Sequence, residues 1–326
     1  MATAPTVDIG LADIQWQRER SAVRAAPAAV LRFARRKPLG AVGGAIIVVM
    51  LLAGVFAPLI APYGYDERDY AAVLQSPSSA HLLGTDDVGR DIFSRIVYGA
   101  RVSMIVSVGA VLLSKILAAV IGIVAGYYGG KVDLVIQRLV DIWIAFPAIL
   151  LLIVFAAVFG TPTQPTDILP GPLSLTLEPS EVRMAQIILS MGLILTAGSS
   201  RVIRGAVIAI RHNQYMESAR ALGAPTPRIL LRYVLPNVAP TILVIATVQL
   251  GTAILIESTI SFLGFGIPPP IPTWGQMLSG NATRFINRAP LLAVWPGLAI
   301  SLAVFGFNML GDALRDVLDP RLRGSR

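Results

Sequence analysis

The residues of this chain that could do chemistry are few and far apart. There is no cysteine, and only two histidines, His81 and His212, occur in 326 residues. A thiolate site or a His-rich transition-metal site is therefore not expected. The phosphate-binding pattern G-x-x-x-x-G-K-[ST] does not occur in the sequence. We expect no metal site and no nucleotide-binding loop in this chain.

A block rich in glycine and aspartate, HLLGTDDVGRD, covers residues 81–91. One histidine near acidic residues more often forms a turn network than a metal site. We expect Thr85 or Asp86 to cap a helix from Val88 to Tyr98. The alternative is a contact with another protein. The candidate residues for that contact are His81, Gly84, Thr85, Asp86, Gly89, Arg90 and Asp91.

Four further ionisable residues lie within or beside long apolar runs: Lys115, Arg138, Asp141 and Glu257. A lysine at the centre of a membrane span costs about 2.5–3.5 kcal/mol on insertion scales. Lys115 should therefore face a pathway or a protein interface, or snorkel to the membrane surface. Glu257 could close a gate, bind a peptide amine, cap a helix or pair with an arginine of another subunit. Arg138 and Asp141, three residues apart, are expected to pair on one helix face.

A polar, basic island over residues 217–237 separates two long apolar runs. Gln214–Leu222 can form a short helix that Gly223 ends in the left-handed conformation. The prolines that follow prevent its continuation, and a second helix is expected over Pro227–Val234. Pro236 then marks the start of the next apolar run. Two short helices at an angle would form a knob that fits a cleft on another protein.

The composition places these motifs in a membrane protein. The chain is 55% hydrophobic and only 14% charged, whereas soluble domains carry about 25% charged residues. A membrane span needs roughly 20 apolar residues. The apolar runs predict an all-α, polytopic protein with six transmembrane helices, at about residues 38–65, 102–128, 135–159, 184–206, 238–263 and 291–311.

The division of the chain follows from these spans. We expect an N-terminal segment over 1–37, a first transmembrane helix over 38–65 and a loop over 66–100. A five-helix core over 101–312 carries the island at 213–237, and a tail over 313–326 ends the chain. A surface helix is possible over 9–36, although Pro27 weakens it.

Basic residues orient the spans. The net charge is +8, and most Lys and Arg residues fall in alternate loops, in both terminal segments and in the island. By the positive-inside rule these parts are cytoplasmic, and the acidic loop over 66–100 is outside. The net charge is thus mainly a signal of topology, and nucleic-acid binding is not expected.

The island resembles the cytoplasmic EAA loop of membrane subunits of ATP-driven importers. The pattern E-x-A-x-x-x-G, nine residues and Y-V-L-P place five residues on the key positions of that loop, with Ser218 in place of its usual second alanine: Glu217, Ala219, Gly223, Leu235 and Pro236. Further blocks, at residues 81–101, 138–147, 257–266, 272–275 and 310–323, are similar to the C-type subunit of the dipeptide/oligopeptide/nickel importer permease family. The resemblance covers about residues 30–323, and Lys115 departs from the apolar residue usual in that family.

The resemblance implies the type I ABC importer permease fold in the plasma (inner) membrane. It implies a B-type permease subunit, one or two ATPase subunits and an extracytoplasmic substrate-binding protein as partners. ATP and Mg²⁺ would bind the ATPases, and this chain would bind no cofactor. The island would dock on an ATPase, and the 81–91 block would contact the binding protein or the B-type subunit.

Short peptides are the expected cargo, and a nickel chelate or another small solute is the alternative. Lys115 and Glu257 carry opposite charges that suit a zwitterion, and neither histidine lies in a span. A stand-alone secondary transporter is a further alternative. It is less well supported, because such proteins often show inverted repeats and midplane charges. Here Lys115 is the one clear midplane charge, and the island would remain unexplained.

Overall fold

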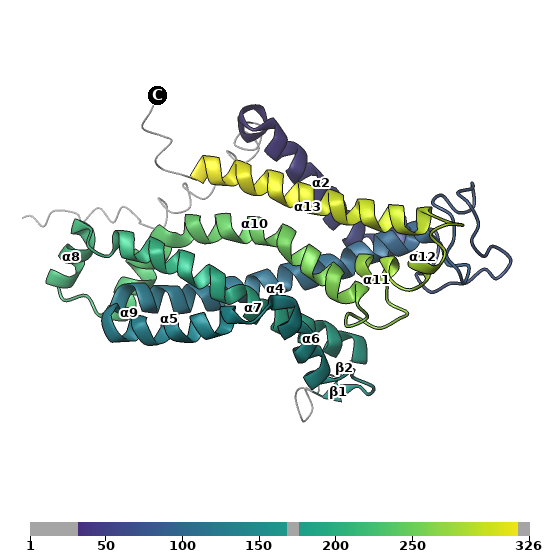
Figure 1. The fold of residues 1–326 in the computed structure, drawn as a ribbon. Helices are drawn as coiled ribbons and strands as arrows, with labels where there is room; N and C mark the ends of the chain where they lie inside the picture. Colours follow the sequence, from purple (N-terminus) through teal and green to yellow (C-terminus); the bar gives the residue numbers. More distant parts are fainter. Residues whose placement is uncertain (1–31, 168–175, 319–326) are drawn as a thin grey trace, which may run out of the picture.

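The computed structural model describes residues 32–167 and 176–318 (Figure 1). The surface helix considered over 9–36 therefore falls mostly outside the described residues. The same holds for most of the N-terminal segment 1–37. The tail over 313–326 is described as far as residue 318.

Helices dominate the described chain. Its first half contains α2 (Pro38–Val55), α3 (Ala57–Ile60), α4 (Ile92–Tyr128), α5 (Gly130–Ala145) and α6 (Ala148–Phe159). Its second half contains α7 (Pro179–Ile210), α8 (Gln214–Ala221), α9 (Thr226–Ile229), the π-helix η1 (Leu230–Val234), α10 (Leu235–Phe262), α11 (Trp274–Leu278), α12 (Asn281–Arg284) and α13 (Leu291–Leu318). Two strands of two residues, β1 (Thr166–Asp167) and β2 (Thr176–Leu177), pair antiparallel beside α6.

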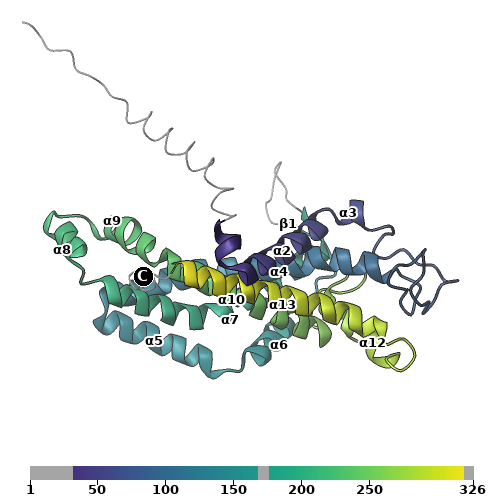
Figure 2. The same cartoon turned by 90° about the horizontal axis from the view of Figure 1, so that it is seen from above.

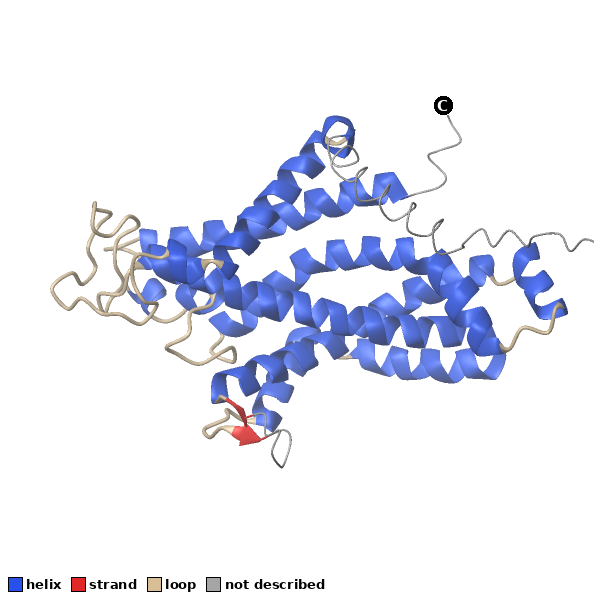
Figure 3. Cartoon of the chain, turned by 180° about the vertical axis from the view of Figure 1, so that it is seen from behind, coloured by secondary structure: helices blue, strands red, loops and turns tan. Residues whose placement is uncertain are grey.

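Five helices of the described chain are long and apolar enough to cross a membrane, and the bent pair α5–α6 makes six if it is one span. The long helices lie side by side, and most loops gather at the ends of the bundle (Figure 3). The predicted all-α, polytopic fold is confirmed in this form.

The third span is not the continuous helix expected over 135–159. It consists of α5 and α6, which meet at an angle of 85°. Phe146 adopts an extended conformation, with φ −87° and ψ 135°. The ring of Pro147 disfavours the helical conformation at the residue before it, and Pro147 has no N–H to continue the helix. The proline expected inside the span therefore breaks it.

The outer loop is shorter than the expected range 66–100, because α4 already begins at Ile92. Its N-cap is Asp91, whose carboxylate accepts a hydrogen bond of 2.7 Å from the backbone N–H of Ser94. The prediction that Thr85 or Asp86 caps a helix starting at Val88 is wrong. Asp91 is the better cap because its side chain reaches the first free N–H groups of the helix.

The central helix, α4, packs most extensively on α7. Two glycines one turn apart allow this close approach. A Cβ atom at Gly122 would lie 2.7 Å from the carbonyl oxygen of Ser200, and one at Gly126 would lie 2.8 Å from Cβ of Val207. Such small-xxx-small patterns let membrane helices approach closely, so the pair is held by backbone-level packing.

The first and last membrane helices form a second close pair, α2 on α13. A Cβ atom at Gly43 would lie 2.6 Å from the carbonyl oxygen of Gly306. Beside the start of α2, Nζ of Lys37 lies 2.5 Å from a carboxylate oxygen of Asp316 on α13. Seen from above, α2 lies along α4, and α13 lies along α10 (Figure 2). The described ends of the chain therefore meet at the same end of the bundle.

The two ends of the bundle have different architectures. The short helices α8 and α9 project from one end, and the loop over 61–91 lies with α11 and α12 at the other (Figure 1). The start of α2 and the end of α13 point toward the α8 end. The polar island and the acidic loop thus lie at opposite ends of the molecule, as the odd number of passes between them (α4, the α5–α6 pair and α7) requires.

Candidate functional site

The island over 213–237 forms a helical hairpin at one end of the bundle. Its first arm, α8, ends at Ala221, and Gly223 follows with φ +74°. Its second arm begins as α9 and continues through η1 directly into α10. The predicted short helix and glycine stop are confirmed. The second arm differs from the expected separate helix, because it is the first part of the long membrane helix.

The helix α8 has one buried face and one exposed face. Met216 and Ala219 are buried, whereas Glu217 is exposed. Leu222, directly after α8, is 87% exposed and forms the apolar tip of the hairpin. Because it lies on a projecting element, Leu222 is available for contact with another protein. Sequence reasoning missed Leu222, although a leucine beside a helix-ending glycine was a usable signal.

Gly223 is required for its backbone conformation. A Cβ atom there would meet no described atom within 4 Å, so close packing within this chain does not demand glycine. The positive φ does, because residues with side chains rarely adopt it. The glycine at this position is therefore explained by the backbone conformation and not by close packing within the chain.

Leu235 and Pro236 lie where the hairpin joins α10. The backbone N–H of Leu235 donates to the carbonyl of Leu230, the wider spacing of a π-turn. Pro236 has no N–H for a regular helical bond, and Pro240 repeats this gap one turn later. Such π-turns often occur at functional sites. The pattern of backbone hydrogen bonds is therefore irregular at the junction between the hairpin and α10.

The hairpin is packed firmly onto the membrane helices. Met216 belongs to a buried cluster with residues of α4, α7, α9 and α10. The guanidinium of Arg220 lies 5.2 Å from the ring centroid of Tyr127, at the end of α4. Arg211, at the end of α7, donates 3.2 Å to the carbonyl of Gly126 on α4. Movement of α8 would therefore be transmitted to at least three membrane helices.

Lys115 lies inside the bundle with its ammonium group between three helices. It is 6% exposed, and Nζ donates 2.5 Å to Oγ of Ser199 on α7 and also donates to Oε1 of Gln249 on α10. The side chain does not snorkel toward an end of the bundle. Of the two alternatives, this geometry favours a place at an interface or pathway.

Gln249 also borders a cavity of about 420 Å³. The cavity lies at the bend between α5 and α6, is also bordered by α7 and α10, and is partly open. Trp143, Phe146 and Pro147 line it from the bend, and Ile194 and Gly198 line it from α7. Lys115 therefore sits one side chain away from this space.

Glu257 is placed elsewhere, at the far end of α10. It is 1% exposed, and Oε1 accepts 2.8 Å from Oγ of Ser261, while Oε2 has no geometric partner. It does not line the cavity beside Gln249. The structure thus does not bring Lys115 and Glu257 together, and a gating role of Glu257 stays a prediction.

Arg138 and Asp141 pair as expected, with 3.7 Å between Nη1 and Oδ2. Asp141 also accepts from Arg201 of α7, so the pair belongs to a larger interhelical network. Asp133 and Arg204 form a second link between α5 and α7, with 2.5 Å between Oδ1 and Nε. Sequence reasoning counted Arg204 only as an orientation signal and missed this pair.

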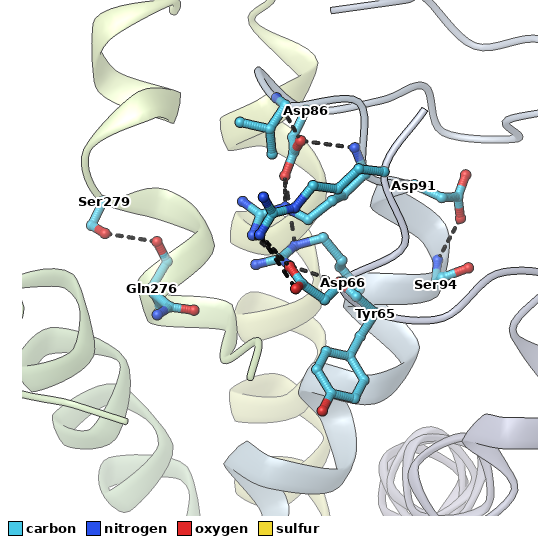
Figure 4. Close-up of polar contacts among 11 residues, drawn as sticks. Tyr65, Asp66, Asp86, Asp91, Ser94, Gln276 and Ser279 are labelled. Carbon is cyan, nitrogen blue, oxygen red and sulfur yellow. Dashed lines mark hydrogen bonds and ion pairs between the residues drawn. The ribbon is translucent and has the colours of Figure 1, made fainter. Parts of the chain in front are cut away.

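The seven candidate contact residues within the 81–91 block lie in the loop that precedes α4. None of the seven is exposed. Nδ1 of His81 lies 3.0 Å from Oδ1 of Asp91. Asp86 accepts backbone bonds from Val88 and Arg90 and a side-chain bond of 2.7 Å from Nε of Arg90 (Figure 4). Gly84 and Gly89 have positive φ, and Thr85 pairs with Asp91 in a β-bridge.

This network favours the turn interpretation of the block over direct contact. Within the described residues no group of three or more His, Cys, Asp or Glu side chains could hold a metal ion. Figure 4 shows Asp66 and Asp86 directed at neighbouring arginine side chains, so these carboxylates are satisfied within the loop. The exposed apolar residues of the loop are Tyr70, Val73 and Leu82. These three side chains are available for contact with another protein.

Sequence profiles of known families match two parts of the chain. The profile described as binding-protein-dependent transport system inner membrane component matches residues 118–324. The chain belongs to this family. A second profile, the N-terminal TM domain of oligopeptide transport permease C, matches residues 28–77. The resemblance to C-type permease subunits with the type I importer fold is thereby confirmed.

Relatives of this permease match over most of their length. A dipeptide transport system permease protein from Alkalihalophilus pseudofirmus is 39% identical over 289 residues, which cover 89% of this chain and 88% of the relative. A glutathione transport system permease protein from Pectobacterium atrosepticum is 37% identical, with 87% of each chain covered. One from Escherichia coli O157:H7 is 36% identical, with 89% of each covered. The chain is therefore a multi-pass membrane permease subunit of an ABC importer.

A buried arginine that sequence reasoning missed links helix ends of the permease at the end opposite the hairpin. Arg183, near the start of α7, donates 2.7 Å to the carbonyl of Phe265 and 3.0 Å to that of Gly160. These carbonyls follow the ends of α10 and α6, where backbone acceptors lack helical partners. Trp274, also fully buried, donates 3.0 Å from Nε1 to the carbonyl of Ile96 on α4.

Proposed function

We propose that this permease forms half of the translocation pathway for short peptides and is driven by separate ATPase subunits. The second half is a B-type permease subunit, and one or two ATPases bind the cytoplasmic end. An extracytoplasmic substrate-binding protein delivers the cargo to the opposite end. ATP and Mg²⁺ bind the ATPases, and this chain binds no cofactor and no nucleic acid. Both termini are cytoplasmic, and the lipid bilayer of the inner membrane surrounds the bundle.

The hairpin over 213–237 is the observation that carries the proposal. Its tip, at Leu222, is exposed, while Met216 behind it is fully buried among the ends of the membrane helices. An apolar tip suits a cleft on a partner, and the packed side transmits rigid-body movement to α4, α7 and α10. ATP binding and hydrolysis on the partner would thus alternate the access of the pathway. The candidate coupling residues remain Glu217, Ala219, Gly223, Leu235 and Pro236.

The cargo is inferred from the relatives. Their names state dipeptide and glutathione transport, and glutathione is itself a short peptide. A nickel chelate or another small solute remains the alternative cargo. A stand-alone secondary transporter would need no exposed apolar hairpin for an ATPase, and it is the less favoured function.

The docking of the ATPase can be tested at Leu222. Leu222→Asp should weaken retention of the ATPase in the purified complex by about tenfold, because a buried leucine side chain contributes about 1.5–3 kcal/mol. Leu222→Met keeps an apolar tip of similar volume and should retain the ATPase. Co-purification from membranes with the partner subunits measures both variants. Equal retention in the two variants would contradict docking through the tip.

The cargo can be tested by uptake in cells. Labelled di- to pentapeptides and nickel are supplied to cells with and without this gene, with the partner genes intact. Loss of peptide uptake on deletion supports the proposal. Unchanged peptide uptake with abolished nickel uptake would overturn the cargo and leave the membership of the permease family unaffected.

A further inference from the structure

The ammonium of Lys115 is buried without a counter-charge. Its two hydrogen-bond partners, Ser199 and Gln249, are both neutral. No Asp or Glu among the described residues forms an ion pair with it. A buried charge usually requires a paired, hydrogen-bonded partner. Intramembrane ionisable residues that remain unpaired typically mark a substrate or ion pathway.

Lys115 fixes the orientation of Gln249. Oε1 of Gln249 accepts from Nζ of Lys115 and also 3.1 Å from Oγ of Ser199. Because an ammonium group can only donate hydrogen bonds, the carboxamide atom that faces Lys115 must be the oxygen. The Nε2 group therefore points away from Lys115. In the described part of the chain it has no hydrogen-bond acceptor, and its side chain borders the cavity of about 420 Å³.

The cavity lies on the less covered side of the bundle. The span that carries Gln249 covers residues 226–262. In its most apolar 18-residue stretch, 17% of the residues are buried, whereas the corresponding share for α4 is 44%. The neighbouring α5 exposes Leu139, Ile142 and Ile144. Ligand cavities typically measure about 300–1,000 Å³, so the volume suits the end of a short peptide. The lining is apolar apart from Gln249 and the indole of Trp143.

We propose that this cavity receives the terminal carboxylate of the peptide in transit. Nε2 of Gln249 donates to the carboxylate, and Lys115 behind it is the fixed counter-charge. The inference rests on the proposed peptide cargo and adds a site within the pathway. A carboxylate fits because Nε2 of Gln249 has no acceptor in the described part of the chain and Lys115 places a positive charge directly behind it, whereas Glu257, which would repel a carboxylate, is buried elsewhere. Lys115 is a positioning residue that acts through Gln249.

The local charge can be measured independently of transport. The chain has no cysteine, so Gly198→Cys introduces a single reporter thiol in this chain. Gly198 borders the cavity, and a Cβ atom there meets no described atom within 4 Å. In the assembled importer, with its other subunits made cysteine-free, an anionic sulfonatoethyl thiosulfonate should react faster than a cationic trimethylammonium-ethyl one. Lys115→Met should lower this rate ratio about tenfold, the effect of one charge about 10 Å away in a partly buried site.

Two controls, one for the charge and one for the assembly of the complex, use the same Gly198→Cys background. Lys115→Arg keeps the charge and should keep the ratio. Lys115→Met should leave the complex intact, because the single O–H of Ser199 can still donate either to Oε1 of Gln249 or to the carbonyl of Leu195. Co-purification with the partners verifies this. A ratio that is the same in wild type, Lys115→Met and Lys115→Arg would overturn the charged site.

Uptake into proteoliposomes tests the carboxylate itself. One dipeptide is supplied as the free acid and as the C-terminal amide, both at saturating binding protein. The binding protein can also discriminate between the acid and the amide. The ratio of the uptake rates of acid and amide in wild type is therefore compared with the same ratio in Lys115→Met and Gln249→Leu. Each variant should reduce the preference for the acid about tenfold, the contribution of a charge-assisted hydrogen bond. Equal losses for acid and amide would overturn the carboxylate site. No uptake of either peptide by wild type would overturn the peptide cargo, while the thiol reactions would still report the charge.

Discussion

At the residue scale, the ionisable groups in apolar surroundings are satisfied in different ways. Lys115 bonds only neutral groups, and Arg183 bonds free backbone carbonyls at helix ends. His81 and Asp91 bond each other inside the outer loop. Burial of a charge demands partners, and the identity of those partners separates structural groups from candidates for function. By this criterion Lys115 is the strongest candidate among these groups for a role in function.

Gly223 provides the prediction at this scale. Gly223→Val should strain the turn by about 1–2 kcal/mol, because valine disfavours the positive φ found there. We expect normal insertion in the membrane, lost peptide uptake and no stimulation of the ATPase by loaded binding protein. Gly223→Asn is the matched control, because asparagine tolerates this conformation, and it should retain most activity. Wild-type uptake in the valine variant would show that the turn geometry is not required.

At the element scale, the hairpin and the α4–α7 pair form one mechanical unit. The buried cluster around Met216 includes residues of both α4 and α7. Arg204 and Asp133 add a link from α7 to α5, which leads to the bend at Pro147. A displacement of α8 can therefore reach the cavity at that bend through packed elements. The α4–α7 contact is the part of this route that substitutions can test.

Gly122 provides the prediction for this contact. Gly122→Ala places a Cβ atom 2.7 Å from the carbonyl oxygen of Ser200, and overpacking of this kind typically costs about 1–3 kcal/mol. The midpoint of thermal unfolding in detergent should fall by several degrees. Gly205→Ala, on the other helix, meets nothing within 4 Å and should leave the midpoint unchanged or raise it. Identical midpoints in both variants would contradict close packing at Gly122.

At the scale of the whole molecule, the two ends of the bundle are built differently. The hairpin and the basic residues of α7 lie at the first, and the acidic loop over 66–91 lies at the second. Arg183, Trp274 and the loop network around Asp86 link the elements at this second end. The proposed orientation requires that the two ends face different compartments.

Thiol labelling provides the prediction for orientation. Ser79→Cys and Thr163→Cys, both at exposed positions, should react with an impermeant reagent added to intact spheroplasts. Ala221→Cys, exposed on the hairpin, should react only after permeabilisation. The unsubstituted chain has no cysteine and is the background control. Labelling of position 221 from outside would overturn both the orientation and the docking of an ATPase.

The sequence by itself determined the spans and the helix–glycine–helix hairpin, and it predicted the orientation of the spans. Each depends on local properties: apolar length, the distribution of Lys and Arg, and the conformational limits of glycine and proline. Only the tertiary structure decided which partners the isolated charges find. Ser199 and Gln249 are distant from Lys115 in the sequence, and so are the carbonyls bound by Arg183. The 85° bend at Pro147 also needed the structure, because a proline can kink a membrane helix or break it, and packing against neighbouring helices decides between the two.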